Sequence, residues 1–306
     1  MNQRNTKASV TLAFFIVLLA SFAAMNALTA GNLMQACLQE AVLALVALVA
    51  VRLAVPDALK SCTQSVQQRG IVRFATLALL LVGLVGGAIT LVIWLFASSS
   101  SMTGFAPAVP SSAADPMRNL LLLLGICLLT GVYEEAFVRV LGIEAFEGAM
   151  GEGGAAPRRA AYGQTAGKSV GVSSDVGHGV AKTPIALDAA AKRAVLVSAV
   201  LFALLHVGVP DVLAGQLVLT QSAMKFAQAL LFGVILGVLY AQTRRLWPCA
   251  LIHAGFDVLY LAPNVLLAGT MPETYASGTA SDTVLLAVTV LMLAGVVLKM
   301  RKEISR

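Results

Sequence analysis

The chain has 306 residues, of which 58% are hydrophobic and only 12% are charged, whereas soluble domains carry about 25% charged residues. This composition excludes an ordinary soluble protein and indicates one that crosses a membrane several times. The net charge of +6 does not argue for a nucleic-acid partner, because the basic residues gather between apolar segments, where they report membrane topology.

Apolar segments long enough to cross a bilayer, which takes about 20 helical residues, recur along the whole chain. They predict an all-α integral membrane protein with about eight transmembrane helices, at residues 8–29, 39–55, 71–97, 119–141, 193–209, 223–243, 246–268 and 283–300. The first segment resembles a signal peptide, but its apolar core is longer than the roughly 7–15 residues usual there. We therefore expect it to remain as a span.

Lys and Arg residues occupy every second connection between these segments. Arg4 and Lys7 begin the pattern, and it ends in the C-terminal tail with Arg301, Lys302 and Arg306. Because short cytoplasmic loops collect positive charge, we expect an even number of spans with both termini in the cytoplasm. The longest connection, 147–192, is basic and rich in Gly and Ala, which predicts a flexible cytoplasmic loop.

Two motif classes are excluded. The loop segment GQTAGKS resembles a phosphate-binding loop, but three residues instead of four separate Gly163 from Gly167, and no strand precedes them. We therefore expect no nucleotide partner. The cysteines show no paired spacing, so neither a disulfide framework nor a CxxC metal site is predicted; they are Cys37, Cys62, Cys127 and Cys249.

Ionisable residues inside spans are costly and mark function by default. The fourth segment contains Glu134, Glu135 and Arg139. On a helix Glu135 and Arg139 share a face and can pair, which leaves Glu134 turned about 100° away without that partner. A structural salt bridge is the alternative explanation for this segment.

Two further segments carry histidines: His206 in the fifth, and His253 with Asp257 in the seventh. At i, i+4 spacing Asp257 can orient the His253 imidazole. Each histidine alone could be an ordinary packing residue. Because three separate accidents would each cost insertion energy, one shared polar site explains all these residues better.

The chemistry of such a site points to hydrolysis. A carboxylate in an apolar cavity suits a general base, and two histidines can polarise a carbonyl, stabilise an oxyanion or bind a metal. The sequence shows no Ser nucleophile with a paired base and no HExxH motif. These groups therefore fit hydrolysis of an amide by activated water.

The ordered motifs Glu134-Glu135-x-x-x-Arg139, Phe202-x-x-x-His206 and His253-x-x-x-Asp257 resemble those of the CAAX-protease and bacteriocin-processing family, the Rce1-like intramembrane endopeptidases. The resemblance covers about residues 120–268. It implies an intramembrane protease of the glutamic type, although a metalloprotease is also possible. Domain boundaries follow as 1–118, a catalytic core at 119–268 that includes the loop 147–192, and 269–306.

The resemblance also implies a role for each residue. Glu134 would activate water with His206, Glu135 and Arg139 would be a supporting pair, and His253 with the residue four later would stabilise the oxyanion. That last position is often Asn in the family, and here it is Asp257. Because an ionised Asp only accepts hydrogen bonds, Asp257 would be protonated, orient His253, or bind a metal.

No cofactor is favoured. Zinc remains possible, and its ligands would come from Glu134, His206, His253 and Asp257.

The predicted depths of these residues disagree. Glu134 and His253 lie within about two turns of the cytoplasmic ends of their predicted spans, whereas His206 lies about 20 Å beyond Arg193 along a straight helix. A helix that begins before Arg193 and protrudes into the cytosol would bring His206 nearer to mid-membrane. We expect that arrangement, with the site in a cytosol-facing cavity.

The predicted partners are the lipid bilayer and a peptide or membrane-protein substrate reached from the cytosolic side. That substrate could be a prenylated tail or a bacteriocin-like peptide. The location would be a membrane, with the bacterial cell membrane favoured. A non-catalytic scaffold or immunity protein and a proton-coupled transporter are the alternatives. A transporter more often shows two matched halves with broken helices, and the sequence shows no internal repeat.

Overall fold

The computed structural model describes residues 13, 15, 16, 20, 32–60, 66–99, 115–150, 187–207, 215–271 and 277–305. In these ranges the chain forms helices and no strand. The predicted first span lies almost wholly outside the described residues, and so does most of the predicted loop 147–192. The all-α membrane architecture predicted from the sequence is confirmed, because seven described helices are long and apolar enough to cross a membrane.

The helices follow one another with short 3-10 and π segments between them. In chain order they are α2 (Leu33–Ala54), η1 (Pro56–Leu59), α3 (Val66–Ser99), α4 (Pro116–Glu134), η2 (Glu135–Ile143), α5 (Glu144–Met150), α7 (Ala189–Val207), α8 (Gln216–Thr243), α9 (Leu246–Pro263), η3 (Asn264–Ala268) and α10 (Ala280–Ser305). Several begin earlier than predicted, most clearly α2, α3 and α8. Asn32 caps α2 by accepting from the Gln35 amide, and Asp115 caps α4.

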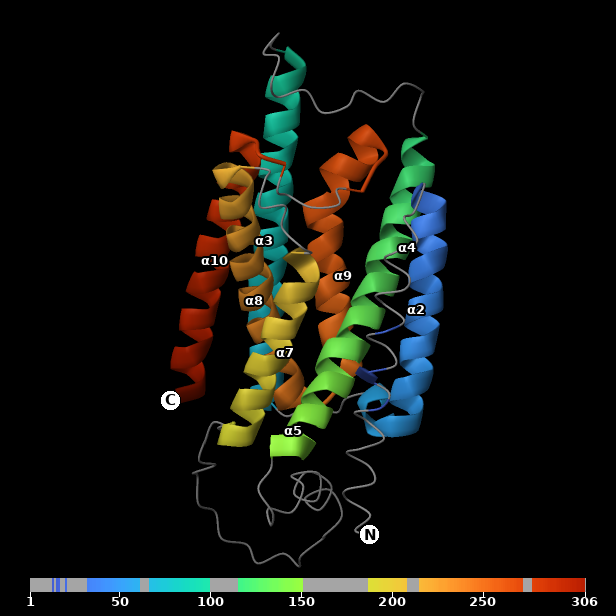
Figure 1. Cartoon of the computed structure of the whole chain (residues 1–306), viewed down its shortest axis with the longest axis vertical. Helices are drawn as coiled ribbons and strands as arrows, with labels where there is room; N and C mark the ends of the chain where they lie inside the picture. Colours follow the sequence, from blue (N-terminus) through green and yellow to red (C-terminus); the bar gives the residue numbers. More distant parts are fainter. Residues whose placement is uncertain are drawn as a thin grey trace, which may run out of the picture.

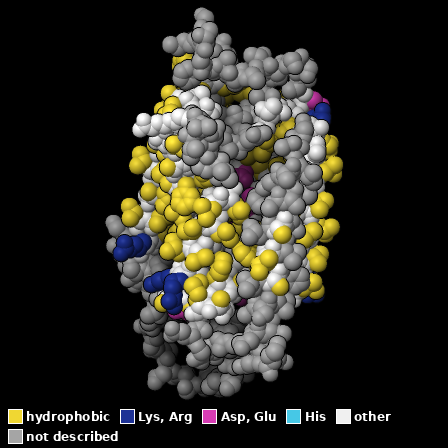
Figure 2. Space-filling model, viewed as in Figure 1, with side chains coloured by type: hydrophobic (Ala, Val, Ile, Leu, Met, Phe, Trp, Pro, Cys, Tyr) yellow, Lys and Arg dark blue, Asp and Glu magenta, His cyan; other side chains and the backbone are white. Residues whose placement is uncertain are grey.

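Successive spans alternate in direction, and α7 and α9 lie between the pair α2 and α4 on one side and α3, α8 and α10 on the other (Figure 1). Helix α9 packs against both α3 and α4, and α7 packs against α8. Many large apolar side chains point outward, such as Leu77 and Leu291, and cover much of the visible flank in yellow (Figure 2). An apolar outer surface of this kind suits contact with lipid.

Small residues let α9 approach its neighbours closely. A Cβ atom built on Gly131 of α4 would lie 2.6 Å from the Ala250 carbonyl oxygen, and one on Gly83 of α3 would lie 2.8 Å from the Phe256 carbonyl oxygen. Neither position has room for a side chain. Helix α9, which carries His253 and Asp257, is therefore held between two helix backbones.

Candidate active site

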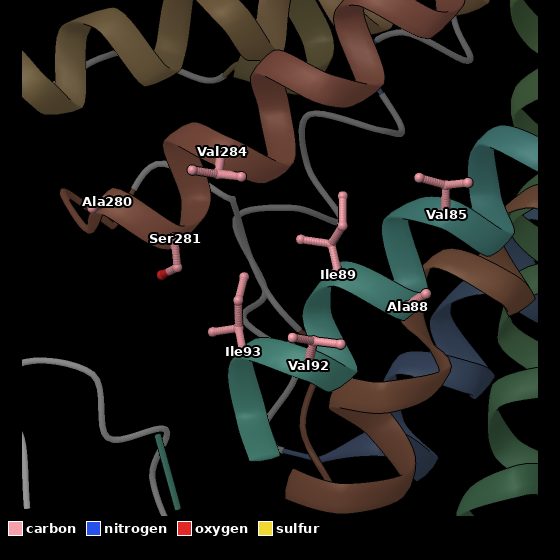
Figure 3. A pocket seen from close by; sticks show the side chains of 8 residues that line it. All are labelled: Val85, Ala88, Ile89, Val92, Ile93, Ala280, Ser281 and Val284. Atoms are coloured by element: carbon pink, nitrogen blue, oxygen red, sulfur yellow. The ribbon is translucent and has the colours of Figure 1, made fainter. Parts of the chain in front are cut away.

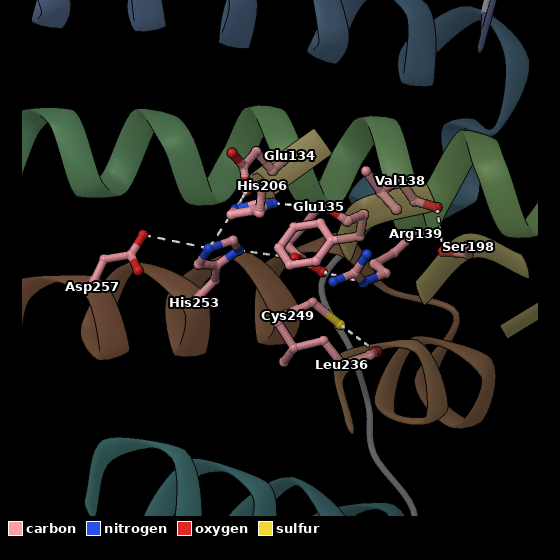
Figure 4. A network of polar contacts seen from close by, with 11 residues as sticks. Glu134, Glu135, Val138, Arg139, Ser198, His206, Leu236, Cys249, His253 and Asp257 are labelled. Carbon is pink, nitrogen blue, oxygen red and sulfur yellow. Dashed lines mark hydrogen bonds and ion pairs between the residues drawn. The ribbon is translucent and has the colours of Figure 1, made fainter. Parts of the chain in front are cut away.

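The six predicted residues meet in the middle of the bundle, although three separate spans carry them (Figure 4). Glu134 is the last residue of α4, and Glu135 and Arg139 lie in η2. His206 lies at the end of α7, and α9 supplies His253 and Asp257. Glu134 Oε2 lies 3.7 Å from Nε2 of His206 and 3.7 Å from Nε2 of His253. The predicted convergence is therefore observed.

Each imidazole is held at its other nitrogen. His206 Nδ1 is 2.9 Å from the Phe202 carbonyl oxygen, and His253 Nδ1 is 2.9 Å from Oε1 of Glu135. Since both of these oxygens are acceptors, Nδ1 is the protonated nitrogen in each ring. Both Nε2 atoms are thereby turned toward Glu134.

Glu135 and Arg139 form a fully buried pair. Glu135 Oε2 lies 3.2 Å from Arg139 Nε, and neither side chain is exposed. The two atoms are not aligned as a hydrogen bond, so the contact is an ion pair. The guanidinium carbon also lies 4.3 Å from the centre of the Phe202 ring, a cation–π contact. The pair therefore supports the site from behind, through Glu135 on His253 and Phe202 on His206.

The exposed side of the site is formed by Glu134, His206 and Asp257. These side chains are 15%, 27% and 19% exposed, whereas the Glu135–Arg139 pair is wholly buried. An acidic side chain is visible at the bottom of a hollow on the face shown in Figure 2. The site therefore opens toward the surface on the side of Glu134, and Glu135 lies behind it.

Asp257 lies beside the same imidazole. Its Oδ2 is 3.4 Å from Nε2 of His253, one turn away on α9. His253 thus has carboxylates near both of its nitrogens, Glu135 at Nδ1 and Asp257 with Glu134 at Nε2. This placement agrees with the predicted alternative in which Asp257 orients His253.

A π-helix begins at the second of the two glutamates. The α4 helix passes without a break into η2 and then α5, so the helix continues to Met150 instead of ending at residue 141. The π geometry begins at Glu135, and such segments often occur at functional sites. Ser198 of α7 donates to the Val138 carbonyl oxygen at 2.9 Å and fastens the π segment to α7.

The longer helix also corrects the predicted depth of Glu134. Met150 lies sixteen residues after Glu134, a distance of about 24 Å, so Glu134 is not near the end of its span. The α7 helix begins at Ala189, before Arg193, as expected, and places His206 about 26 Å from its start. The two residues therefore lie at similar depth.

Two further charged residues lie within electrostatic range of this site and were not predicted. Glu40 of α2 interacts electrostatically with His253 and Asp257 and bonds Thr130; its Oε2 is buried without a hydrogen-bond partner among the described residues. Lys225 of α8 interacts electrostatically with Glu134 and Asp257 and donates to Gln228 at 3.0 Å. The signal that reveals both is the one used for the other residues, a charge inside a span.

The site offers the nitrogen and oxygen donors that zinc binds. Neighbouring donor atoms around Glu134 and His253 are 3.4 to 3.7 Å apart, near the separation of about 3.4 Å between ligands of tetrahedral zinc. Yet within the described ranges no group of three or more His, Cys, Asp or Glu side chains is placed so that it could hold one ion.

A comparison with protein families agrees with the motifs. The model of the family described as "Type II CAAX prenyl endopeptidase Rce1-like" matches residues 116–259, which contain all six residues of the site. The match confirms the resemblance predicted from the sequence and supports intramembrane CAAX-type endopeptidase activity in general. No curated protein and no solved structure matches the chain.

Proposed function

We propose that this chain, an Rce1-like protein by the match over residues 116–259, hydrolyses a peptide bond inside the membrane with a water molecule activated by Glu134. One observation carries the proposal. Glu134 Oε2 is buried, has no hydrogen-bond partner among the described residues, and lies 3.7 Å from the Nε2 atoms of both histidines. A water molecule bound there would contact a base and an acceptor at once.

The first step would be attack by this water on the substrate carbonyl carbon. Glu134 takes one proton from the water, while the Nε2 lone pair of His206 accepts a hydrogen bond from the other. The new C–O bond moves the carbonyl electron pair onto oxygen. His253, surrounded by three carboxylates, carries a proton on Nε2 and donates a hydrogen bond to this oxyanion.

The second step would break the C–N bond. The oxyanion collapses, and Glu134 returns its proton to the leaving amine nitrogen. The products are a carboxylic acid and an amine, and the enzyme recovers its initial protonation. The Glu135–Arg139 pair moves no proton and keeps the His253 ring in place.

The substrate class follows from the family and the depth of the site. A peptide held in the membrane by a prenyl group near its C-terminus would bring its scissile bond to Glu134, and we propose access from the end of the bundle that carries the basic connections. A bacteriocin-like peptide is the second substrate to test. Comparison of peptide C-termini in membranes from cells that express wild type or Glu134→Gln identifies the substrate. Peptides shortened only with the wild type support the proposal, and identical C-termini contradict it.

Chelation tests the proposed water-only chemistry. We expect cleavage to survive exhaustive chelation, with no stoichiometric zinc in the purified protein. Zinc that is retained in the wild type and lost in His206→Ala or His253→Ala would replace this mechanism with that of a metalloprotease. Elemental analysis of the same preparations gives a readout that does not depend on activity.

A further inference from the structure

A groove of about 530 Å³ lies between α3 and α9 at the end of the bundle where the α8–α9 turn is found. One part of its wall is polar and cationic, with Lys60, Arg245 and Trp247. The remainder is mostly apolar and runs along the two helices; it is lined by Val72, Thr76, Leu80, Pro248, Leu251, Ile252 and Gly255. Neither Glu134 nor a site histidine lines it.

The two ends of the groove differ in chemistry. Its α3 residues Val72, Thr76 and Leu80 follow at intervals of four on one helix face, a stripe about 12 Å long. Its α9 residues continue upward from Trp247 to Gly255. Charged groups therefore occupy one end, and an apolar track leads from them toward the middle of the membrane.

The cationic end is built by specific contacts. The Arg245 guanidinium donates to the Asp57 carbonyl oxygen, and the Trp247 indole donates to the Leu59 carbonyl oxygen at 3.2 Å. Lys60 pairs with the Asp57 carboxylate at 2.7 Å, yet its side chain is 67% exposed. Two cations and one carboxylate leave one net positive charge, which matches the single negative charge of a phosphodiester.

We propose that this groove binds one molecule of an anionic glycerophospholipid, with the phosphate at Lys60 and Arg245 and an acyl chain between α3 and α9. Tryptophan is enriched at this level of membrane proteins, and basic residues at helix ends attract anionic lipid headgroups. The prenyl chain of a substrate is a poorer fit, because Leu251 and Gly255 lie about 200° around α9 from His253 and Asp257.

A second groove on the bundle has no charged residue in its lining and serves as a comparison. It measures about 520 Å³ and lies between α3 and α10. All of its lining side chains are apolar except Ser281 (Figure 3). It offers no charge to a phosphate, so the combination of cations and apolar track separates the α3–α9 groove from ordinary lipid contact.

Native mass spectrometry of the delipidated full chain, titrated with dioleoyl phosphatidylglycerol, tests the proposal. We expect one tightly bound lipid, with dioleoyl phosphatidylcholine bound at least tenfold more weakly. The double variant Lys60→Gln and Arg245→Gln should weaken phosphatidylglycerol binding about 30-fold, at a factor of about five per cation. Equal binding of the two lipids by the wild type would overturn the proposal.

The matched control removes the same charge elsewhere on the same end of the bundle. Lys192 and Arg193 are both exposed at the start of α7, so Lys192→Gln with Arg193→Gln should leave the affinity unchanged. An equal loss in this control would mean that binding reflects overall charge and would refute a defined site.

A third variant tests the apolar track with both cations in place. Thr76→Phe fills the groove between α3 and α9 and should reduce lipid binding at least tenfold. Full affinity in this variant would contradict the placement of the acyl chain. Helicity measured by circular dichroism shows whether the variants are folded. The Thr76 hydroxyl donates to the Val72 carbonyl oxygen of its own helix at 2.7 Å, so this variant leaves both cations in place and its result is independent of theirs.

Discussion

Glu134 and Glu135 are adjacent in the chain, but their neighbours give them different tasks. Glu135 is buried between Arg139 and His253, at 3.2 and 2.9 Å, so its oxygens are engaged by protein groups. The Glu134 side chain is 15% exposed, and among the described residues its Oε2 has no hydrogen-bond partner and lies 3.7 Å from both Nε2 atoms. A general base must be able to contact water, and of the two glutamates only Glu134 has a partly exposed side chain.

Asp257→Asn tests the role of the carboxylate beside His253. The amide keeps the size of the side chain and an acceptor oxygen near Nε2, so we expect the cleavage rate to fall by no more than about tenfold. Asp257→Ala removes the acceptor and should cost about 10²-fold, the lower range for a group that supports proton transfer. Single-turnover cleavage measures both. Equal losses in the two variants would show that the negative charge itself is required.

The sequence was sufficient to predict the six central residues but not Glu40 and Lys225. Both lie near the start of a predicted span, at the second residue of 39–55 and the third of 223–243, where a charge is unremarkable. The helices in fact begin at Leu33 and Gln216. The apolar pattern shows only the part of each helix that contacts lipid. The helices themselves begin six or seven residues earlier, so Glu40 and Lys225 lie further inside them than the sequence indicated.

At the scale of elements, the π-helix is the feature that sequence patterns could not reveal. A change from α to π geometry alters which carbonyl each amide bonds, and the pattern of apolar residues does not report that change. The Ser198 bond to Val138 is one tertiary contact made by the π segment. The i, i+4 pairing of Glu135 with Arg139 was predictable and is observed. The extension of the helix through α5 was not predictable from the sequence, because residues 142–150 are less apolar than a membrane span.

Close packing of α4 on α9 is a second property of the elements that can be tested. Gly131→Ala would place a methyl group 2.6 Å from the Ala250 carbonyl oxygen, so the helices must separate. We expect a loss of about 1–3 kcal/mol in stability and slower cleavage, because α9 carries His253. Thermal unfolding in detergent measures the stability, and a cleavage assay measures the rate.

Gly295→Ala is the matched control, because a Cβ at that position in α10 meets nothing within 4 Å. It should be neutral or stabilise the helix by up to about 1 kcal/mol. A Gly131→Ala protein as stable and active as this control would show that the α4–α9 contact does not hold the site in place.

At the scale of the whole molecule, the positions of the basic residues agree with the alternating direction of the spans. The α2–α3 and α8–α9 connections and the start of α7 lie at one end of the bundle (Figure 1), and they carry Arg52, Lys60, Lys192, Arg193, Arg244 and Arg245. At the opposite end, the described helix starts carry Arg118. Apolar length and the spacing of basic residues were enough to predict all seven described spans and their order. Their packing depends on close backbone contacts that composition does not report.

Cysteine labelling tests the orientation of the molecule. The basic residues of 147–192 predict that this loop faces the cytoplasm, so an impermeant thiol reagent added outside intact cells should not modify Ser173→Cys. The same reagent should modify it after the membrane is opened. Ready labelling in intact cells would invert the topology and place the basic end outside.

The most direct measurement of the central claim is the single-turnover cleavage rate of a verified substrate peptide by purified wild type, Glu134→Gln and Glu135→Gln. Glutamine keeps the size and polarity of Glu134 but cannot accept a proton, so Glu134→Gln should lose about 10²–10⁴-fold in rate while its folding and substrate binding stay unchanged. Glu135→Gln leaves Arg139 buried without its counter-charge and should lose thermal stability together with activity. Near-normal cleavage by a folded Glu134→Gln protein would contradict the account and make Glu135 the candidate base.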